Sequence, residues 1–277
     1  MGERRHRQAL AETKLACPCD LRPTTFNLMA RTTEESTAIR AAAGGAEKSE
    51  YVKQVFSEIA PRYDLLNHLL SLNIDRIWRR RAIAKLGVSR NPTGRYLDLC
   101  AGTMDVSAAL AADTAFHGSI IAADFAEPML RAGFSKARGR PIDPVTADAL
   151  CLPMRSGSAA GAIVAFGIRN VANLNGALAE VYRVLEPGAC FVILEFSTPR
   201  SRIINAGYQL YFNKILPTIG GLISGHRTAY GYLPRSVANF PDEPELARRM
   251  TSAGFQSVTW KSLSFGIAAI HVGLKPA

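Results

Sequence analysis

The sequence predicts an α/β fold in which helices cover both faces of a mostly parallel sheet. Short, nearly continuous apolar runs alternate with segments of helical periodicity, and such runs are typical of strands buried on both faces. The composition supports a packed protein, because 48% of the 277 residues are hydrophobic and 20% are charged. This length is sufficient for one large domain or two small ones with a substantial core.

The N-terminal part of the chain lacks this regular pattern. Residues 1–48 mix charged and small side chains and end in a run of alanine and glycine, so we expect a disordered extension. A targeting peptide is one alternative, which acidic residues such as Glu34 and Glu35 disfavour, and a true start at Met29 is another. The sequence therefore predicts one folded domain over residues 49–277.

A helical cap is predicted ahead of the sheet. From Tyr51, apolar residues recur at helical spacing and indicate two amphipathic helices that meet near Pro61. A third helix is predicted from Ile77 to Leu86, where Gly87 ends it.

The strands and helices that follow alternate regularly, with one interruption. Residues 203–225 form an apolar and aromatic insertion after the fifth strand. Ser264-Phe265-Gly266 separates the last two strands, which indicates a hairpin and thus an antiparallel pair. The expected elements are strands at 96–100, 119–123, 142–146, 160–166, 190–196, 257–263 and 267–274, with helices at 106–112, 128–137, 173–185 and 245–252.

The turn after the first strand is the expected ligand site, because ligands of open α/β sheets bind outside the carboxyl ends of the strands. The turn lies within LDLCAGTMDV, in which Gly102 allows close backbone approach. About 20 residues further on, Asp124 ends the second strand, where a carboxylate binds ribose hydroxyls. Asp148 and Ala149 follow the third strand, where an adenine amino group would lie.

Two carboxylates near this turn favour a cationic ligand over a phosphate. A dinucleotide places its pyrophosphate at the helix N-terminus, where several glycines allow close approach. Asp105 occupies that helix start, and Asp98 lies before the turn. The pair favours S-adenosylmethionine, which carries a sulfonium, over NAD or ATP. The alternative for Asp105 is a helix N-cap.

Charge and cysteine content exclude several functional classes. The net charge is +10, but the basic residues are spread along the chain, which disfavours a nucleic-acid partner. The 5 cysteines are scattered, which predicts a reducing compartment and no metal site. No apolar run reaches the roughly 18 residues of a membrane span. We expect a cytoplasmic protein with peripheral contact at the inner face of the membrane as a further option.

Several motifs resemble those of the ubiquinone/menaquinone biosynthesis C-methyltransferase family. They are LDLxxGTxD from Leu97, FGIRNV (Phe166–Val171), YRVLEPGA (Tyr182–Ala189), LEFS (Leu194–Ser197) and YDLLNHLLSLNIDRIW (Tyr63–Trp78). The resemblance covers the chain from Tyr51 onward. It implies a class I methyltransferase Rossmann-like fold with a seven-stranded sheet that contains one antiparallel strand. It also implies S-adenosylmethionine as methyl donor, no metal, and a prenylated hydroquinone acceptor.

The resemblance implies demethylmenaquinol as the acceptor, with the corresponding ubiquinone intermediate as the alternative. Carried over by position, the cofactor contacts fall on Thr103, Asp124, Asp148, Ala149 and Ala165, beside Asp98 and Gly102 of the turn. This sequence departs from the family pattern at Cys100-Ala101, Met104, Asn73, Asp75 and Ala165. Met104 must either turn away from the methionine moiety or pack against it.

Three residues are candidates for the chemistry. Arg169, just after the fourth strand, is expected to stabilise a phenolate on the acceptor, and a structural ion pair is the alternative. Tyr63 is expected to cover the cofactor, or else to pack between helices. His226 is a candidate general base, with a polar loop residue as the alternative.

The apolar insertion is expected to cover the acceptor ring and to let the prenyl tail reach a bilayer. A core-covering helix and a homodimer contact are the alternatives. Three other functions stay open: a binding subunit without turnover, a nucleic-acid methyltransferase, and a methyltransferase of another small aromatic metabolite.

Overall fold

The structure is a computed structural model that describes residues 46–60, 63–64, 71, 73–211 and 227–277. The helices are α2 (Ala46–Ile59), α4 (Ile74–Ile83), α5 (Asp105–Ala111), α6 (Glu127–Ala137), α7 (Leu174–Val184), α8 (Arg202–Leu210), α10 (Arg227–Ala238) and α11 (Glu243–Ser252). The strands are β1 (Arg95–Leu99), β2 (Ser119–Asp124), β3 (Ile142–Thr146), β4 (Ala159–Ala165), β5 (Leu185–Phe196), β6 (Gln256–Leu263) and β7 (Ala268–Leu274). Short 3-10 helices are η2 (Val88–Arg90), η3 (Ile168–Asn170) and η5 (Ser264–Gly266).

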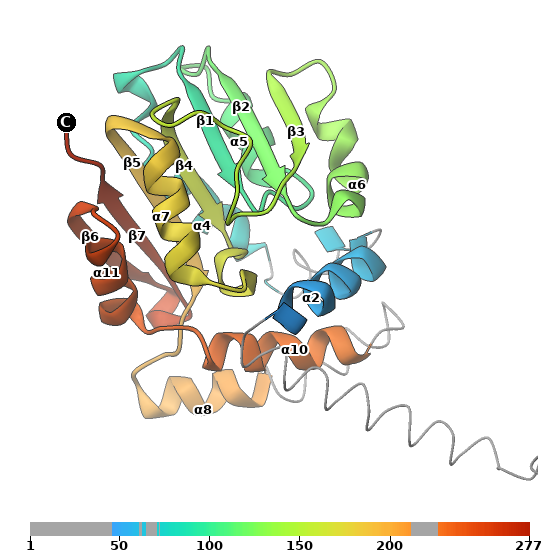
Figure 1. The fold of residues 1–277 in the computed structure, drawn as a ribbon. Helices are drawn as coiled ribbons and strands as arrows, with labels where there is room; N and C mark the ends of the chain where they lie inside the picture. Colours follow the sequence, from blue (N-terminus) through green and yellow to red (C-terminus); the bar gives the residue numbers. More distant parts are fainter. Residues whose placement is uncertain (1–45, 61–62, 65–70, 72, 212–226) are drawn as a thin grey trace, which may run out of the picture. The chain divides into compact units, whose positions relative to one another are not determined.

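The strands form one seven-stranded sheet in the order β3-β2-β1-β4-β5-β7-β6 (Figure 1). Strands β1 to β5 run parallel to one another. Strand β7 runs antiparallel to both β5 and β6. This confirms the α/β fold with one antiparallel strand. The strand order reverses between β1 and β4, and this switch point is where ligands of open α/β sheets bind.

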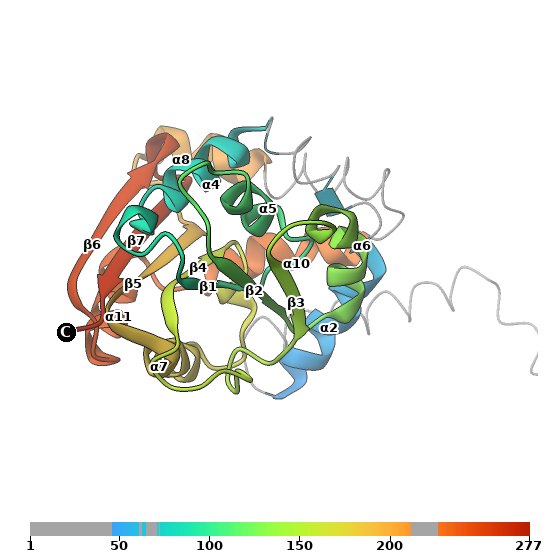
Figure 2. The ribbon, with the colours of Figure 1, turned by 90° about the horizontal axis from the view of Figure 1, so that it is seen from above.

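Successive side chains along each strand point to opposite faces of the sheet, so each face has its own apolar core. On one face, Tyr96, Val192 and Leu194 pack with residues of α4, α5 and α6. On the other, Leu97 and Phe191 pack with residues of α7 and α11. Figure 2 shows these two helical layers on opposite sides of the strands. The near-continuous apolar runs in the sequence reflect this double coverage.

Most elements lie where the sequence predicts them, and the differences are at their ends. Helix α4 begins at Ile74, preceded by Asn73 at φ 60°, and not at Ile77. Asparagine tolerates this left-handed conformation better than most residues, so it replaces the glycine that is usual in the family. Strand β5 begins at Leu185 and not at Cys190, because Leu185 already pairs with Ala159 of β4.

The cap lies beyond the carboxyl ends of the parallel strands, where α2 and α10 contact each other and η3 (Figure 1). Helix α2 begins at Ala46, close to the predicted start of the domain. The second predicted cap helix, after Pro61, lies largely outside the described residues. So does most of the extension expected over residues 1–48, but residues 46–48 form the start of α2.

The start of the apolar insertion forms helix α8, and residues 212–225 lie outside the described part of the chain. No helix among the described residues combines the length and the hydropathy that a membrane crossing requires.

Candidate active site

A pocket opens at the carboxyl ends of the central strands, next to the switch point of the sheet. Residues that end β1, β2 and β4 line it, and Val52, Lys53 and Phe56 of α2 line it from the cap. The sequence indicates the helix that carries these three residues but not their role in the pocket. Of the predicted site residues, six line this pocket: Tyr63, Gly102, Asp124, Asp148, Ala149 and Ala165.

The carboxylate of Asp124 is the most fully organised polar group in this pocket. Its Oδ2 accepts a hydrogen bond from the N–H of Gly102 at 2.7 Å, and its Oδ1 accepts one from the N–H of Ala126 at 2.8 Å. Burial raises the pKa of Asp124, and these backbone hydrogen bonds act in the opposite direction. Each carboxylate oxygen keeps acceptor capacity beyond one N–H bond. The group is therefore oriented to accept the two hydroxyls of a ribose.

The turn after β1 holds two non-glycine residues in the left-handed region, Cys100 at φ 52° and Met104 at φ 64°. This conformation costs roughly 1–2 kcal/mol for each such residue. Met104 is fully buried in the core beside α4, α5 and α6, and it does not line the pocket. The sequence left open whether the Met104 side chain packs against the methionine moiety or turns away from it, and in the structure it turns away from the pocket. Cys100 does line the pocket.

The far end of the pocket is built from small side chains and one further carboxylate. Asp148 Oδ1 accepts a hydrogen bond from the N–H of Leu150 at 2.9 Å, and a β-bridge joins Asp148 to Cys151. Ala149 and Ala165 also line the pocket. The residues expected to hold the ribose and the base of the cofactor, Asp124 and Asp148, therefore lie in one pocket, and their contacts with a cofactor stay a prediction.

Asp98 does not line the pocket, which corrects its expected role as a cofactor contact. Its Oδ2 accepts hydrogen bonds from the N–H of Ser107 at 3.0 Å and from the Ser107 hydroxyl at 2.6 Å. The two-residue periodicity of β1 places Asp98 on the same face as Tyr96, toward α5, rather than at the strand end. The contact joins β1 to α5.

Asp105 and Thr103 also do not line the pocket. Asp105 is not the N-cap, because Met104 occupies that position, and its carboxylate forms ion pairs with Arg79 at 3.1 Å and Lys136 at 2.6 Å. The hydroxyl of Thr103 donates to Asp64. Neither Asp98 nor Asp105 lines the pocket and both carboxylates bind other protein groups, so these contacts do not support the argument that the two carboxylates attract a sulfonium.

The stability of the fold is expected to depend on pH through Asp98. Burial raises the pKa of Asp98 to about 7, while hydrogen bonds from Ser107 and the charge of Arg79 act to lower it. The folded state therefore holds this proton up to a higher pH than the unfolded chain does, so stability from this group is lost as pH rises. The free energy of unfolding of the wild type, minus that of Asp98→Asn, should fall between about pH 4 and pH 7 with a slope of at most about 1.4 kcal/mol per pH unit.

Urea unfolding of both proteins at a series of pH values measures this difference. A difference that stays constant over this range would show that Asp98 titrates alike in the folded and unfolded chains.

Arg169 lies in η3, and its side chain is buried in an ion pair with Glu195 of β5. Arg169 Nη1 is 2.6 Å from Glu195 Oε1 and also donates to the carbonyl oxygen of Phe166. Arg169 Nε donates to the Ser236 hydroxyl at 3.4 Å. Arg169 itself does not line the pocket, but Gly167 and Asn170 on either side of it do. The geometry of Arg169 is therefore that of a structural ion pair, which was the alternative to its expected role at the acceptor.

Sequence reasoning missed two charged partners of this arginine. Glu195 stands in the apolar run FVILEF, and a carboxylate in such a run signals a buried partner. Lys48 Nζ donates to the carbonyl oxygen of Arg169 at 2.7 Å and so joins α2 to η3. Burial and the charge of Arg169 lower the pKa of Lys48. No sequence pattern indicated that contact.

Tyr63 lines the pocket and packs against Phe56 of α2, with 5.9 Å between ring centroids. Tyr63 therefore packs against the cap helix and also lines the pocket, and its role in covering the cofactor stays a prediction. His226, the candidate general base, lies outside the described residues.

The strand order, with the antiparallel β7 and a pocket at the switch point, is that of the Rossmann-like fold of S-adenosylmethionine-dependent methyltransferases. Two solved structures share the fold. One is a SAM-dependent methyltransferase, possible histamine N-methyltransferase, from Thermotoga maritima, with a TM-score of 0.55, 17% identity, and coverage of 80% of this chain and 98% of that chain. The other is Haemonchus contortus phosphoethanolamine N-methyltransferase 2 in complex with S-adenosyl-L-methionine, with a TM-score of 0.52, 12% identity, and coverage of 72% and 53%.

Sequence comparison is more specific. The model of the ubiE/COQ5 methyltransferase family matches residues 45–275, and the chain belongs to this family. A demethylmenaquinone methyltransferase of Thermus thermophilus is 47% identical over 80% of this chain and 100% of its own length. A ubiquinone/menaquinone biosynthesis C-methyltransferase UbiE of Geobacter sulfurreducens is 43% identical over 83% of this chain and 90% of its own. The chain is therefore an S-adenosylmethionine-dependent methyltransferase.

Proposed function

We propose that this protein transfers a methyl group from S-adenosylmethionine to a ring carbon of a prenylated hydroquinone, demethylmenaquinol. The observation that carries the proposal is the pocket around Asp124, at the switch point of the sheet, in a chain that matches the Thermus thermophilus demethylmenaquinone methyltransferase over that protein's whole length. The relative from Geobacter sulfurreducens carries both quinone names, so methylation of the corresponding ubiquinone intermediate is the second candidate.

When bound, the donor would supply an electrophilic methyl group. An activated ring carbon would attack this methyl group in line with the C–S bond, S-adenosylhomocysteine would leave, and the ring carbon would then lose its proton to restore the aromatic ring. The protein's part is to hold donor and acceptor about 3–3.5 Å apart, which can contribute roughly 7–11 kcal/mol to catalysis. Asp124 and Asp148 orient the adenosine end. Gly167 and Asn170 line the wall where β4 ends, and the Arg169–Glu195 pair fixes the backbone between them. We propose that Arg169 acts by positioning this wall, in place of direct contact with a phenolate.

The acceptor assay tests the reaction. Purified protein, donor with a labelled methyl group, and reduced demethylmenaquinol should yield labelled menaquinol by mass spectrometry. Parallel reactions use the ubiquinone-pathway quinol and phenols without a prenyl tail. Faster transfer to an untailed phenol would favour the alternative of a small-aromatic methyltransferase. Cofactor binding by calorimetry without transfer to any acceptor would favour a binding subunit.

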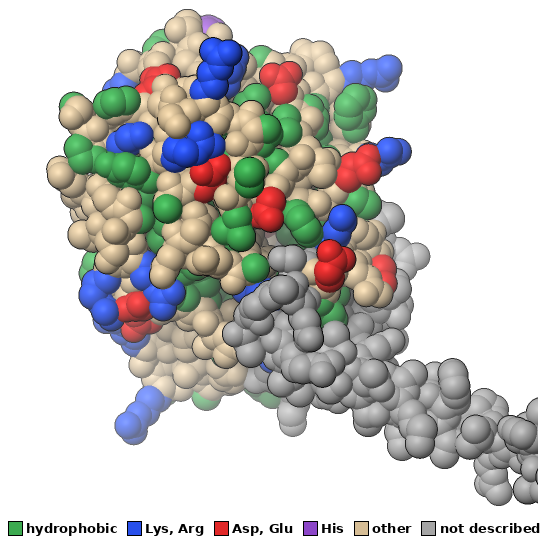
Figure 3. All heavy atoms as spheres, viewed as in Figure 1, with side chains coloured by type: hydrophobic (Ala, Val, Ile, Leu, Met, Phe, Trp, Pro, Cys, Tyr) green, Lys and Arg blue, Asp and Glu red, His purple; other side chains and the backbone are tan. Residues whose placement is uncertain are grey.

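A nucleic-acid acceptor has weaker support. On the face shown in Figure 3, Lys and Arg side chains are scattered among Asp and Glu and do not gather in one patch. A dedicated nucleic-acid surface usually concentrates its basic side chains. The expected homodimer contact stays a prediction.

We further propose that α8 docks on an anionic membrane surface and presents the prenylated substrate to the pocket. Ile203 and Leu210 on this helix are 86% and 55% exposed, and Arg200 and Arg202 stand beside its N-terminus. Apolar side chains next to basic ones are typical of helices that lie in a membrane interface.

The variant Ile203→Glu should reduce binding to phosphatidylglycerol vesicles by about three- to tenfold, because an inserted apolar group becomes a charge that the lipid headgroups repel. Vesicle sedimentation measures the bound fraction. Phe134→Ser is the matched control, since Phe134 is an exposed apolar residue on α6. Equal losses in the two variants would contradict the assignment of the docking surface to α8.

A further inference from the structure

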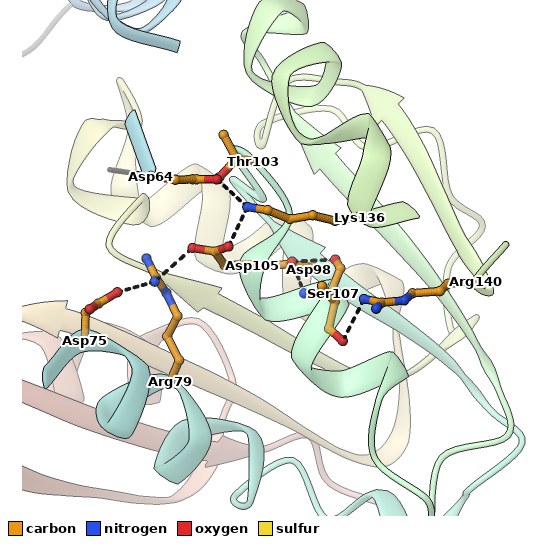
Figure 4. Close-up of polar contacts among 10 residues, drawn as sticks. Asp64, Asp75, Arg79, Asp98, Thr103, Asp105, Ser107, Lys136 and Arg140 are labelled. Carbon is orange, nitrogen blue, oxygen red and sulfur yellow. Dashed lines mark hydrogen bonds and ion pairs between the residues drawn. The ribbon is translucent and has the colours of Figure 1, made fainter. Parts of the chain in front are cut away.

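An alternating chain of charges links the segment after α2 to the turn that follows β1. It runs from Asp64 to Lys136, then to Asp105, Arg79 and Asp75 (Figure 4). The distances are 2.5 Å from Lys136 to Asp64, 2.6 Å from Lys136 to Asp105, and 3.1 Å from Arg79 to Asp105. Lys136 therefore bridges two carboxylates that come from different parts of the chain.

The charged side chains are buried at the Asp75 end of this chain of ion pairs and partly exposed to solvent at the Asp64 end. The exposed fractions of the side chains are 5% for Asp75, 9% for Arg79, 21% for Asp105, 25% for Lys136 and 35% for Asp64. Buried ion pairs are costly to break, whereas exposed ones are weak and are screened by salt. The contact to Asp64 is therefore the one that ionic strength and substitution should affect most readily.

Asp64 is placed to act on the cofactor pocket through its neighbour. Two consecutive residues of the cap contact two consecutive residues of the turn. Tyr63 lies against Gly102, and Asp64 accepts a hydrogen bond from the hydroxyl of Thr103. A Cβ on Gly102 would stand 3.9 Å from the Tyr63 ring. Tyr63 lines the pocket, whereas Asp64 does not. Asp64 thus holds the backbone next to a residue that faces the ligand.

Helix α6 can supply Lys136 only because it packs closely on the same turn. A Cβ on Gly133 would come within 2.3 Å of the carbonyl oxygen of Thr103, so this position requires glycine. One helical turn further on, Lys136 then reaches both Asp64 and Asp105. Asp64 is therefore held by two contacts, the hydrogen bond from the Thr103 hydroxyl and the ion pair with Lys136, and the close packing of α6 on the turn makes the second possible.

We propose that Asp64 is a positioning residue for the donor site: bound to Thr103 and Lys136, it holds Tyr63 against the turn and thereby completes the wall of the pocket. This inference rests on the proposed function, in which the pocket binds S-adenosylmethionine. It assigns a role in cofactor affinity to a carboxylate that does not touch the cofactor.

The test is a double-mutant cycle with Tyr63, read as the dissociation constant of S-adenosylmethionine by calorimetry. Asp64→Asn keeps an acceptor for Thr103 and loses the ion pair, so affinity should fall about two- to fivefold. Asp64→Ala loses both contacts and should weaken binding about ten- to thirtyfold. In a Tyr63→Ala background, which itself weakens binding, the same Asp64 changes should each cost less than about twofold, because residues that act as one unit are not additive.

Ionic strength gives a second readout that a general loss of stability would not reproduce. Between low and high salt, the affinity of the wild type should fall more than that of Asp64→Asn, since only the wild type has an ion pair there to screen. Glu127→Gln is the matched control, because it removes an exposed ion pair with Arg131 from the same helix α6. Its cofactor affinity and salt dependence should equal those of the wild type.

Two results would overturn the inference. One is an unchanged dissociation constant in Asp64→Asn and Asp64→Ala, and the other is an equal effect of these changes with and without the Tyr63 ring. Should Asp64→Ala fail to fold, Asp64→Asn alone completes the cycle. A wild-type chain that binds no S-adenosylmethionine would instead refute the proposed function, so the two failures are distinguishable.

Discussion

Replacing Glu195 with alanine is expected to lower the free energy of unfolding by about 3–5 kcal/mol, because it leaves the buried guanidinium of Arg169 without its anionic partner. For a domain of this size, the loss corresponds to a fall in melting temperature of roughly 6–20 °C. Thermal unfolding followed by circular dichroism measures it. The effect should be among the largest of any single substitution, since both side chains of the pair are almost fully buried.

The double variant Glu195→Met with Arg169→Met is the control for this interpretation. Apolar residues of similar size often replace a buried ion pair at little cost, so the double variant should be more stable than Glu195→Ala. A melting temperature of Glu195→Ala within about 2 °C of the wild type would show that water or another anion compensates the charge of Arg169.

The same pair decides what Arg169 does in the reaction. If the guanidinium only stabilises a phenolate, Arg169→Ala lowers turnover and leaves cofactor affinity nearly intact. If it positions the wall between Gly167 and Asn170, turnover and cofactor affinity fall together. The buried pair with Glu195 and the contact to the carbonyl oxygen of Phe166 favour the second outcome.

Replacing Asp124 with alanine is expected to weaken S-adenosylmethionine binding by about 10- to 150-fold. A hydrogen bond to a charged acceptor contributes roughly 1.5–3 kcal/mol, and the ribose hydroxyls lose that acceptor. The turn also loses the partner of its Gly102 N–H group. Titration calorimetry of the wild type and the variant measures the change.

Two further variants refine this prediction. Asp124→Asn keeps one oxygen acceptor and should be intermediate between the wild type and Asp124→Ala. Asp143→Asn removes a carboxylate from an exposed position of the neighbouring strand β3, and its affinity for the cofactor should be that of the wild type.

Because burial raises the pKa of Asp124, the affinity of the wild type for the cofactor should fall on acidification at a higher pH than it would with an aspartate of ordinary pKa. Unchanged affinity in Asp124→Ala would place the ribose elsewhere.

The site was predictable where it depends on strand ends. The carboxyl ends of parallel strands converge at one edge of the sheet, so residues that end or follow β1, β2, β3 and β4 could be assigned to one pocket without coordinates. Gly102, Asp124, Asp148, Ala149 and Ala165 all follow this rule. Their direct contacts with the cofactor stay predictions.

The site was not predictable where it depends on the direction of a side chain. Asp98 and Asp105 flank the turn that contains Gly102, yet Ser107 binds the first, while Arg79 and Lys136 bind the second. The partners of Asp105 come from other helices, and no local pattern pairs them. The contacts of Lys48 with η3 and of Asp64 with α6 are likewise long-range.

By itself, the sequence determined the succession of strands and helices, the double coverage of the sheet and the edge at which the ligand site opens. These features depend on the periodicity of apolar residues and on the short connections between elements, which are local properties. Only the tertiary structure decided which charged side chains face the ligand and which face one another. A buried charge must find a partner among residues distant in sequence, and packing determines which partner lies within reach.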